Sequence, residues 1–225
     1  MTPASSEAPA LEEPPPATDL FSFEKATAAQ ESFSKLVKKR STLPKRIVYV
    51  AGVDVAYAKQ LSFAVAAALN YRNLKPIEVQ HVSSLVKVPY RAGFLGFREA
   101  APMVEAVREL NMVPDVVLVD GHGLAHPRGF GLACHVGVVL DLPTIGVAKS
   151  LFYGKLHRNR VLDREGRSIG AAINVKEKIF YVSVGHKISL NRAVEVASNC
   201  IIRNMLEPIR IAHQEATRMA RKIES

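Results

Sequence analysis

The chain has 225 residues, and 48% of them are hydrophobic, which is enough for the core of one α/β domain. Its apolar runs are too short to span a bilayer, and no basic segment precedes an apolar stretch near residue 1, so neither a membrane span nor a secretory signal is expected. The cysteines, Cys134 and Cys200, form no CxxC pair or disulfide framework. These features predict a cytoplasmic protein.

The net charge is +9, and it is unevenly distributed, because residues 1–24 contain five acidic residues and no Lys or Arg. The remainder is therefore strongly basic, which suits a polyanionic partner such as nucleic acid. Charge alone is equally compatible with a basic protein that binds no nucleic acid. Residues 1–24 are rich in proline and small residues and are predicted to form a disordered tail, leaving residues 25–225 as a single domain.

The hydrophobic pattern predicts alternating helices and strands along the domain. In chain order they are a helix at 26–40, strands at 47–57, 62–71 and 76–85, a helix at 93–110, a strand at 115–120, a helix at 135–140, a strand at 144–148, a hairpin at 169–175 and 179–184, and helices at 190–202 and 209–223. Short connections predict that the first three strands are antiparallel, with parallel strands following. The predicted fold class is α/β, with a mixed sheet and helices on both faces.

Two aspartates occupy strand positions where a purely structural carboxylate is unexpected. Asp54 interrupts an apolar strand, so it must be paired, hydrogen-bonded or metal-bound; a salt bridge to a basic residue remains an alternative. Asp120 follows a buried-type strand, at the edge of an open sheet where ligands bind, although a turn-capping role is also common there. Together they suggest a divalent-cation site, since Mg²⁺ prefers carboxylate and water oxygens.

Other polar residues give weaker signals. By periodicity alone, Glu99 is better explained as a solvated residue near a helix start, and His213 as a surface or packed residue of a basic amphipathic helix. A zinc site could be imagined in the segment that contains His122, His126, Cys134 and His135, but the spacing fits no standard zinc motif.

A series of motifs resembles the endonuclease V family, in the same order and with similar spacing over about residues 25–223. The motifs are VAGVD (50–54), Pro89-Tyr90 followed by Phe97-Arg98-Glu99, DGHGLAHPR (120–128), PTIGVAKS (143–150), Gly185-His186 and EPIRIAH (207–213). The resemblance implies a ribonuclease H-like fold and a cofactor of Mg²⁺, for which Mn²⁺ can substitute. It also implies a DNA-repair endonuclease that recognises deoxyinosine and hydrolyses the second phosphodiester bond on its 3′ side, leaving a 3′ hydroxyl and a 5′ phosphate.

The resemblance assigns roles to individual residues. Asp54, Glu99 and Asp120 correspond to the acidic metal ligands, with His213 completing the site, and Lys149 corresponds to a cation that stabilises the scissile phosphate.

The substrate-binding residues follow from the same resemblance. Pro89 and Tyr90 begin the family's strand-separating wedge, in which Ala92 replaces a usual proline; Gly93, Leu95, Gly121, Gly123 and Leu132 match positions of the base pocket, where glycine backbone groups can hydrogen-bond hypoxanthine. Turn formation or core packing could also explain these residues, Leu132 above all.

Three alternatives have different consequences. An inosine-specific endoribonuclease acting on single-stranded RNA would carry the same motifs, since family members differ in substrate. A recombinase or junction nuclease would share the carboxylates but has no need of the Pro89-Tyr90 wedge or of the PTIGVAKS segment. A non-catalytic nucleic-acid binder would not need three acids facing a phosphate. We expect the protein to be a monomer with DNA as its partner.

Overall fold

Long β-prone runs form a three-stranded antiparallel unit at the start of the domain: β1 (Tyr49–Ala58), β2 (Leu61–Asn70) and β3 (Pro76–Leu85). Strand β2 pairs along its whole length with β1 and also pairs with β3. β2 is alanine-rich and almost fully buried, whereas burial alternates along β3, the edge strand. This computed structural model describes residues 21–224.

The sheet continues from β1 through parallel strands and then returns to antiparallel pairing. Its order is β3-β2-β1-β4-β5-β9-β8-β7-β6, with β4 parallel to both β1 and β5, and β9 antiparallel to β5. The additional strands are β4 (Val116–Asp120), β5 (Thr144–Ala148), β6 (Lys155–His157), β7 (Arg160–Leu162), β8 (Ser168–Val175) and β9 (Lys178–His186). The mixed α/β sheet predicted from the sequence is therefore confirmed.

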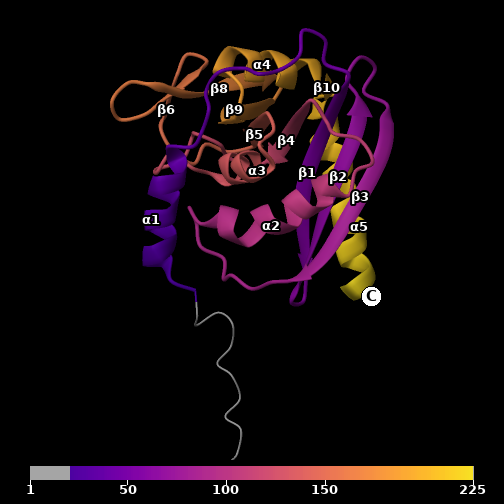
Figure 1. The fold of residues 1–225 in the computed structure, drawn as a ribbon. Helices are drawn as coiled ribbons and strands as arrows, with labels where there is room; N and C mark the ends of the chain where they lie inside the picture. The colour runs from indigo at the N-terminus through magenta and orange to yellow at the C-terminus, as the bar shows by residue number, and fades with distance from the viewer. Residues whose placement is uncertain (1–20, 225) are drawn as a thin grey trace, which may run out of the picture.

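Helices cover both faces of this sheet (Figure 1). On one face lie α2 (Leu95–Arg108) and α3 (Leu132–Leu140), and on the other lie α4 (Leu190–Asn199) and α5 (Glu207–Glu224). Alternation along the strands explains the two cores, since Val117 and Val119 of β4 pack on the α2 side while Val116 and Leu118 pack on the α5 side. None of the described helices is long and apolar enough to cross a membrane.

Several predicted boundaries differ from the structure. α1 (Phe23–Ser34) begins three residues before the predicted start, because the side chain of Ser22 caps it by accepting from the N–H of Lys25 at 3.2 Å. Two residues of the predicted tail, Phe23 and Glu24, belong to α1, and residues 1–20 of that tail lie outside the described residues. α1 also ends at Ser34 rather than residue 40, since the segment beyond it bonds to the core.

Other corrections concern the second half of the chain. α3 begins at Leu132 rather than 135, and α4 ends at Asn199 because a short hairpin follows it, formed by β10 (Ile201–Ile202) and β11 (Met205–Leu206). The short strands β6 and β7 were missed, since each has only three residues and is too brief to show periodicity.

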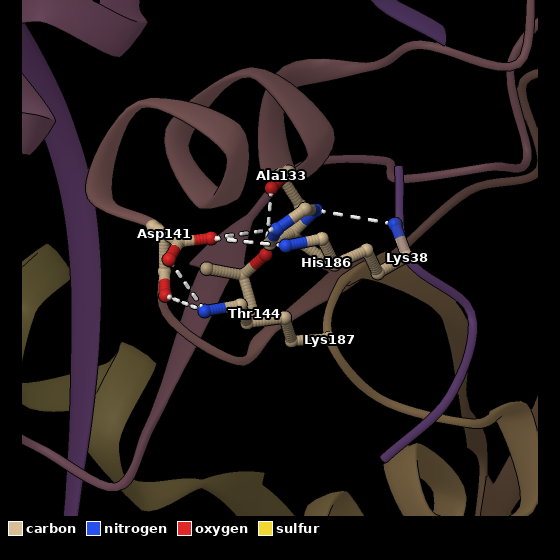
Figure 2. A network of polar contacts seen from close by, with 6 residues as sticks. All are labelled: Lys38, Ala133, Asp141, Thr144, His186 and Lys187. Atoms are coloured by element: carbon tan, nitrogen blue, oxygen red, sulfur yellow. Dashed lines mark hydrogen bonds and ion pairs between the residues drawn. The ribbon is translucent and has the colours of Figure 1, made fainter. Parts of the chain in front are cut away.

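A polar network fixes the segment after α1 to the end of α3 (Figure 2). Buried His186 accepts a hydrogen bond from the backbone N–H of Lys38 at its Nδ1 and faces Asp141 with its Nε2, 3.4 Å from the carboxylate. Lys187 pairs with the same Asp141 carboxylate at 2.6 Å, and Thr144 donates to the carbonyl of Ala133 at 2.8 Å. This network therefore accounts for His186 of the Gly185-His186 motif as a structural residue.

Candidate active site

Two aspartates lie side by side where neighbouring parallel strands meet. β1 and β4 pair Val53 with Val119, so that Asp54 and Asp120 occupy the next position on each strand. Both side chains point to the face of the sheet that α5 covers, because they are an even number of residues from Val50, Val116 and Leu118, which pack on that face. Asp54 is 8% exposed and accepts a hydrogen bond from the N–H of Val55 at 2.8 Å. The sheet register thus brings together carboxylates that are far apart in sequence.

Helix α5 places a histidine against this pair. Nδ1 of His213 lies 2.6 Å from Oδ2 of Asp54. The helix can approach the strand this closely because residue 52 is glycine: a Cβ atom there would lie 2.2 Å from the carbonyl carbon of Pro208, in the first turn of α5. Gly52 therefore sets the distance at which His213 meets Asp54.

Lys149 supplies a cation directly after β5. Its Nζ lies 3.8 Å from Oδ2 of Asp120, and its side chain is 65% exposed, so it can turn toward an anionic ligand. Burial raises the pKa of Asp54 above its usual value, and burial together with the Asp54 charge raises the pKa of Asp120 to about 6. Carboxylates held so close together without a cation carry a cost that a bound metal ion would offset.

Glu99 reaches the same region from the opposite face of the sheet. It lies in the second turn of α2, is 8% exposed, and accepts a hydrogen bond from the hydroxyl of Tyr57 at 2.8 Å. Side chains from both faces can approach each other here because β4 ends at Asp120, whereas its neighbour β1 continues to Ala58. Burial, with a contribution from the charges of Asp54 and Asp120, raises the pKa of Glu99 to about 7.

Among the described residues, one group of side chains could hold a metal ion: Asp54, Asp120 and His213, whose ligand atoms all lie within 4.8 Å of one another. Two carboxylates and one imidazole are side chains that can ligate a divalent metal ion. Glu99 is outside this group and is turned toward Tyr57, so the structure assembles three of the four predicted ligands.

The zinc alternative is not supported by the geometry. Cys134 is buried and directs its thiol to the carbonyl of Val184 at 3.6 Å, while His126 contacts the carbonyl of Gly93 at 3.0 Å through its Nε2. His135 packs among phenylalanine rings. These residues form no common ligand group within the described residues, and both cysteines are free.

A cavity of 430 Å³ adjoins the acidic cluster at Asp120 and Lys149. Five of the predicted substrate residues line it: Tyr90, Gly93, Leu95, Gly121 and Leu132. Tyr90 is 72% exposed at the mouth of the cavity, as a side chain that inserts into a duplex would be. Ala92 also lines the cavity, whereas Pro89 does not. Five of the seven predicted substrate residues thus line one cavity beside the carboxylates, and Pro89 and Gly123 do not.

The glycines act differently from the sequence-based expectation. Gly123 does not line the cavity; its N–H donates to Oγ of Ser183 at 2.8 Å, and a Cβ there would lie 2.0 Å from the carbonyl oxygen of Val184. The N–H of Gly121 donates to the carbonyl of Val147 at 2.8 Å. Both donors are therefore used within the protein, and close packing explains Gly123.

Sequence reasoning missed the residues that shape the loop before α2. The carbonyl of Gly93 accepts from Gln30 at 3.0 Å and Arg128 at 2.7 Å, and it contacts His126 at 3.0 Å. Gly93 itself has φ +83°, which favours glycine. His126 and Arg128 belong to the DGHGLAHPR motif, so the motif indicated their importance, but Gln30 in α1 gave no signal.

Phe152 and His122 were also missed as cavity residues. Both line the cavity, and their rings lie 5.9 Å apart between centroids. Nδ1 of His122 is buried with no hydrogen-bond partner among the residues that the structure describes. Tyr57, which holds Glu99, was missed because a tyrosine near a strand end is common.

Comparison with known proteins agrees with this geometry. The sequence profile of the family Endonuclease V matches residues 31–214. Endonuclease V of Thermofilum pendens is 40% identical over 210 residues, covering 89% of this chain and 90% of that protein. The Gloeobacter violaceus protein is 41% identical over 189 residues, covering 77% of each chain.

Solved structures give the same result. The catalytic domain of human endonuclease V superposes with a TM-score of 0.81 and 30% identity, covering 88% of this chain and 96% of that one. The Ciona intestinalis endonuclease V, solved with a DNA containing an inosine followed by a ribo-adenosine, has a TM-score of 0.81 and 26% identity, covering 89% and 98%. The fold is ribonuclease H-like, as expected. This chain belongs to the endonuclease V family, a family of nucleases.

Proposed function

We propose that this protein is a DNA-repair endonuclease that recognises a deaminated purine, deoxyinosine above all, and hydrolyses the second phosphodiester bond on its 3′ side. The observation that carries the proposal is the shared wall of the carboxylate cluster and the 430 Å³ cavity, formed by Asp120 and Lys149. An extruded base in that cavity brings its own strand to the cluster. The protein acts as a monomer, and its products carry a 3′ hydroxyl and a 5′ phosphate.

The donor set supports Mg²⁺, with Mn²⁺ as a substitute, held by Asp54, Asp120 and His213. Burial raises the pKa of the Asp54 carboxyl, and a cation bound beside it would favour the charged carboxylate. When bound, the ion supplies an activated water and neutralises charge on the phosphate. Glu99 approaches the same site from α2, as an acid that Tyr57 orients.

The side chains of the protein position and stabilise the reacting phosphate. Lys149 is exposed beside Asp120, so its ammonium can contact the non-bridging oxygens as negative charge develops on them. His213 is held by Asp54, and its imidazole is 53% exposed toward solvent. The hydroxyl of Tyr57 fixes Glu99 near both aspartates, so the acid keeps one orientation during the reaction.

The cavity supports selection of hypoxanthine over adenine. Leu95 and Gly96, the first two residues of α2, line it, and the N–H groups in the first turn of a helix have no partner within the helix. These donors suit the carbonyl oxygen of hypoxanthine, whereas the amino group of adenine would leave them unpaired. Burial lowers the pKa of His122, which lines the cavity, so its neutral ring can accept a hydrogen bond from the ring N–H of hypoxanthine.

The test is strand cleavage of a labelled duplex with one deoxyinosine, beside the matched adenine duplex and an inosine-containing RNA. Each substrate is incubated with Mg²⁺, with Mn²⁺ and with chelator. We expect a metal-dependent nick at the second bond 3′ to deoxyinosine and none in the adenine duplex. Preferential cleavage of the RNA would assign an endoribonuclease instead, and binding without cleavage in every metal would contradict an enzymatic role.

A further inference from the structure

A second cavity, of 510 Å³, opens on the α5 side of the carboxylate cluster. It shares Asp120, Ala148 and Lys149 with the base cavity, which lies on the α2 side. A strand that enters one cavity and passes Lys149 therefore continues directly into the other. We call this second cavity the downstream groove.

The walls of the downstream groove are mainly apolar. They are formed by the end of β5, by β9, by the β10–β11 hairpin and by the first turn of α5, through Val147, Ile179, Phe180, Met205, Leu206 and Ile209. Ile179 is 38% exposed at its edge. Apolar and aromatic surfaces next to a phosphate-binding site can stack a nucleobase of any identity. The walls therefore fit the flat face of a base rather than a second phosphate.

A cation at the rim is available for the sugar–phosphate backbone. Nζ of Lys178 lies 3.1 Å from the thioether sulfur of Met205, a weak acceptor, and forms no ion pair with a carboxylate in the part of the chain that the structure describes. Arg210, in contrast, is committed to Glu207 and Gln214. Apart from Lys149, Lys178 is thus the cation of the groove that can neutralise a phosphate, and it lies beside Glu177, which also lines the groove.

We propose that the downstream groove is the binding site for the first nucleotide on the 3′ side of the cleaved bond. Its base stacks against Ile179 and Met205, and Lys178 pairs with the next phosphate. The order along the strand follows from the two cavities: lesion base on the α2 side, scissile phosphate at Lys149, and next nucleotide on the α5 side. The inference rests on the proposed function, because it assumes a nucleic-acid strand at the carboxylates.

The test compares two deoxyinosine substrates that differ only in the first nucleotide after the cut. One has a normal nucleotide there, and the other has a reduced abasic residue. We expect the wild-type kcat/KM to be about tenfold lower for the abasic substrate, the size that stacking of one base contributes. The double variant Ile179→Thr/Met205→Ala should show the same loss on the normal substrate and no further loss on the abasic one.

Ile202→Thr is the matched control for these changes. Ile202 is an exposed apolar residue on the same hairpin as Met205, but it does not line the groove. It should leave both substrates at wild-type rates. If the double variant lowered cleavage of both substrates equally, its role would be structural and the proposal would be overturned.

Lys178 is tested by salt dependence. Lys178→Ala should reduce the slope of log K against log salt concentration by about one for binding in chelator, as loss of one phosphate contact does. Lys176→Asn, in the turn directly before β9 and outside the groove, should not. Wild-type protein that cleaves both deoxyinosine substrates equally well would refute the downstream groove alone, whereas failure to cleave deoxyinosine at all would refute the proposed function as well.

Discussion

Nδ1 of His213 lies 2.6 Å from Oδ2 of Asp54, although the two residues are 159 positions apart in the chain. The contact joins the last helix to the central part of the sheet and completes the group of potential metal ligands. Removing the charge of Asp54 should therefore lower the cleavage activity without lowering the free energy of unfolding.

Asp54→Asn should lower the rate of metal-dependent cleavage by about 10³-fold, since metal ligation contributes several kcal/mol to charge stabilisation. In chelator the unfolding free energy should stay the same or rise, because a buried carboxylate with raised pKa has been removed. Mg²⁺ should raise the Tm of the wild type but not of the variant. Asp141→Asn, in the network of Figure 2, is the control and should keep full activity. Wild-type cleavage by Asp54→Asn would exclude the proposed site.

Tyr57→Phe tests whether the orientation of Glu99 matters. Loss of the 2.8 Å hydrogen bond should reduce kcat about tenfold and weaken Mg²⁺ binding, while the unfolding free energy changes by about 1 kcal/mol at most. Tyr71→Phe also removes a single hydroxyl hydrogen bond, to Asn199, and should leave cleavage unchanged. Equal activity of both variants would show that Glu99 needs no support from Tyr57.

Lys149→Met should lower kcat by about 10²- to 10³-fold with little change in Tm, because its ammonium is exposed and acts on the phosphate rather than on packing. Lys155→Met, an exposed lysine in β6, is the matched control. Single-turnover cleavage measures the effect. A change confined to KM would contradict a role in charge stabilisation and indicate a binding role instead.

Gly52→Ala tests the close approach of α5 to β1. The added methyl group would meet the backbone of Pro208 at 2.2 Å, so the helix must shift. We expect the unfolding free energy to fall by about 1–3 kcal/mol and cleavage to fall with it, because His213 moves away from Asp54. Denaturant unfolding and cleavage assays on the same preparation check both effects. A fully active and equally stable variant would show that α5 does not depend on this glycine.

Stability should depend on pH through His135, a partly buried residue whose Nδ1 is shielded from solvent. Burial lowers its pKa from 6.5 to about 4 in the folded protein. The unfolded chain therefore binds the proton more tightly than the folded protein does, and protonation of His135 favours unfolding. The unfolding free energy is unaffected by this histidine above pH 6.5 and decreases as the pH falls from 6.5 toward 4. His135→Gln should remove a slope of about 1.4 kcal/mol per pH unit between these limits.

The difference between wild-type and His135→Gln unfolding free energies, measured in chelator, isolates this histidine from the acidic cluster. That difference should rise from pH 4 to 6.5 and remain flat above it. A difference that does not vary with pH would contradict a neutral imidazole at this position.

The first three strands were predictable because their patterns are local. β3 was expected at 76–85 and is found there, since its residues alternate and its ends coincide with turns. α1 and α4 were predicted too long, because their last turns are replaced by contacts with distant residues, such as the bond from Lys38 to His186. Periodicity does not reveal such long-range competition.

The sequence by itself determined the fold class, the family and the identities of the candidate site residues, since apolar periodicity and the motifs around Asp54 and Asp120 are local properties of the chain. Only the tertiary structure decided which residues meet. It placed His213 on Asp54, turned Glu99 to Tyr57, and used the N–H of Gly123 within the core. The physical reason is that these contacts depend on strand register, helix approach and the burial of polar groups, which are fixed only when distant segments pack together.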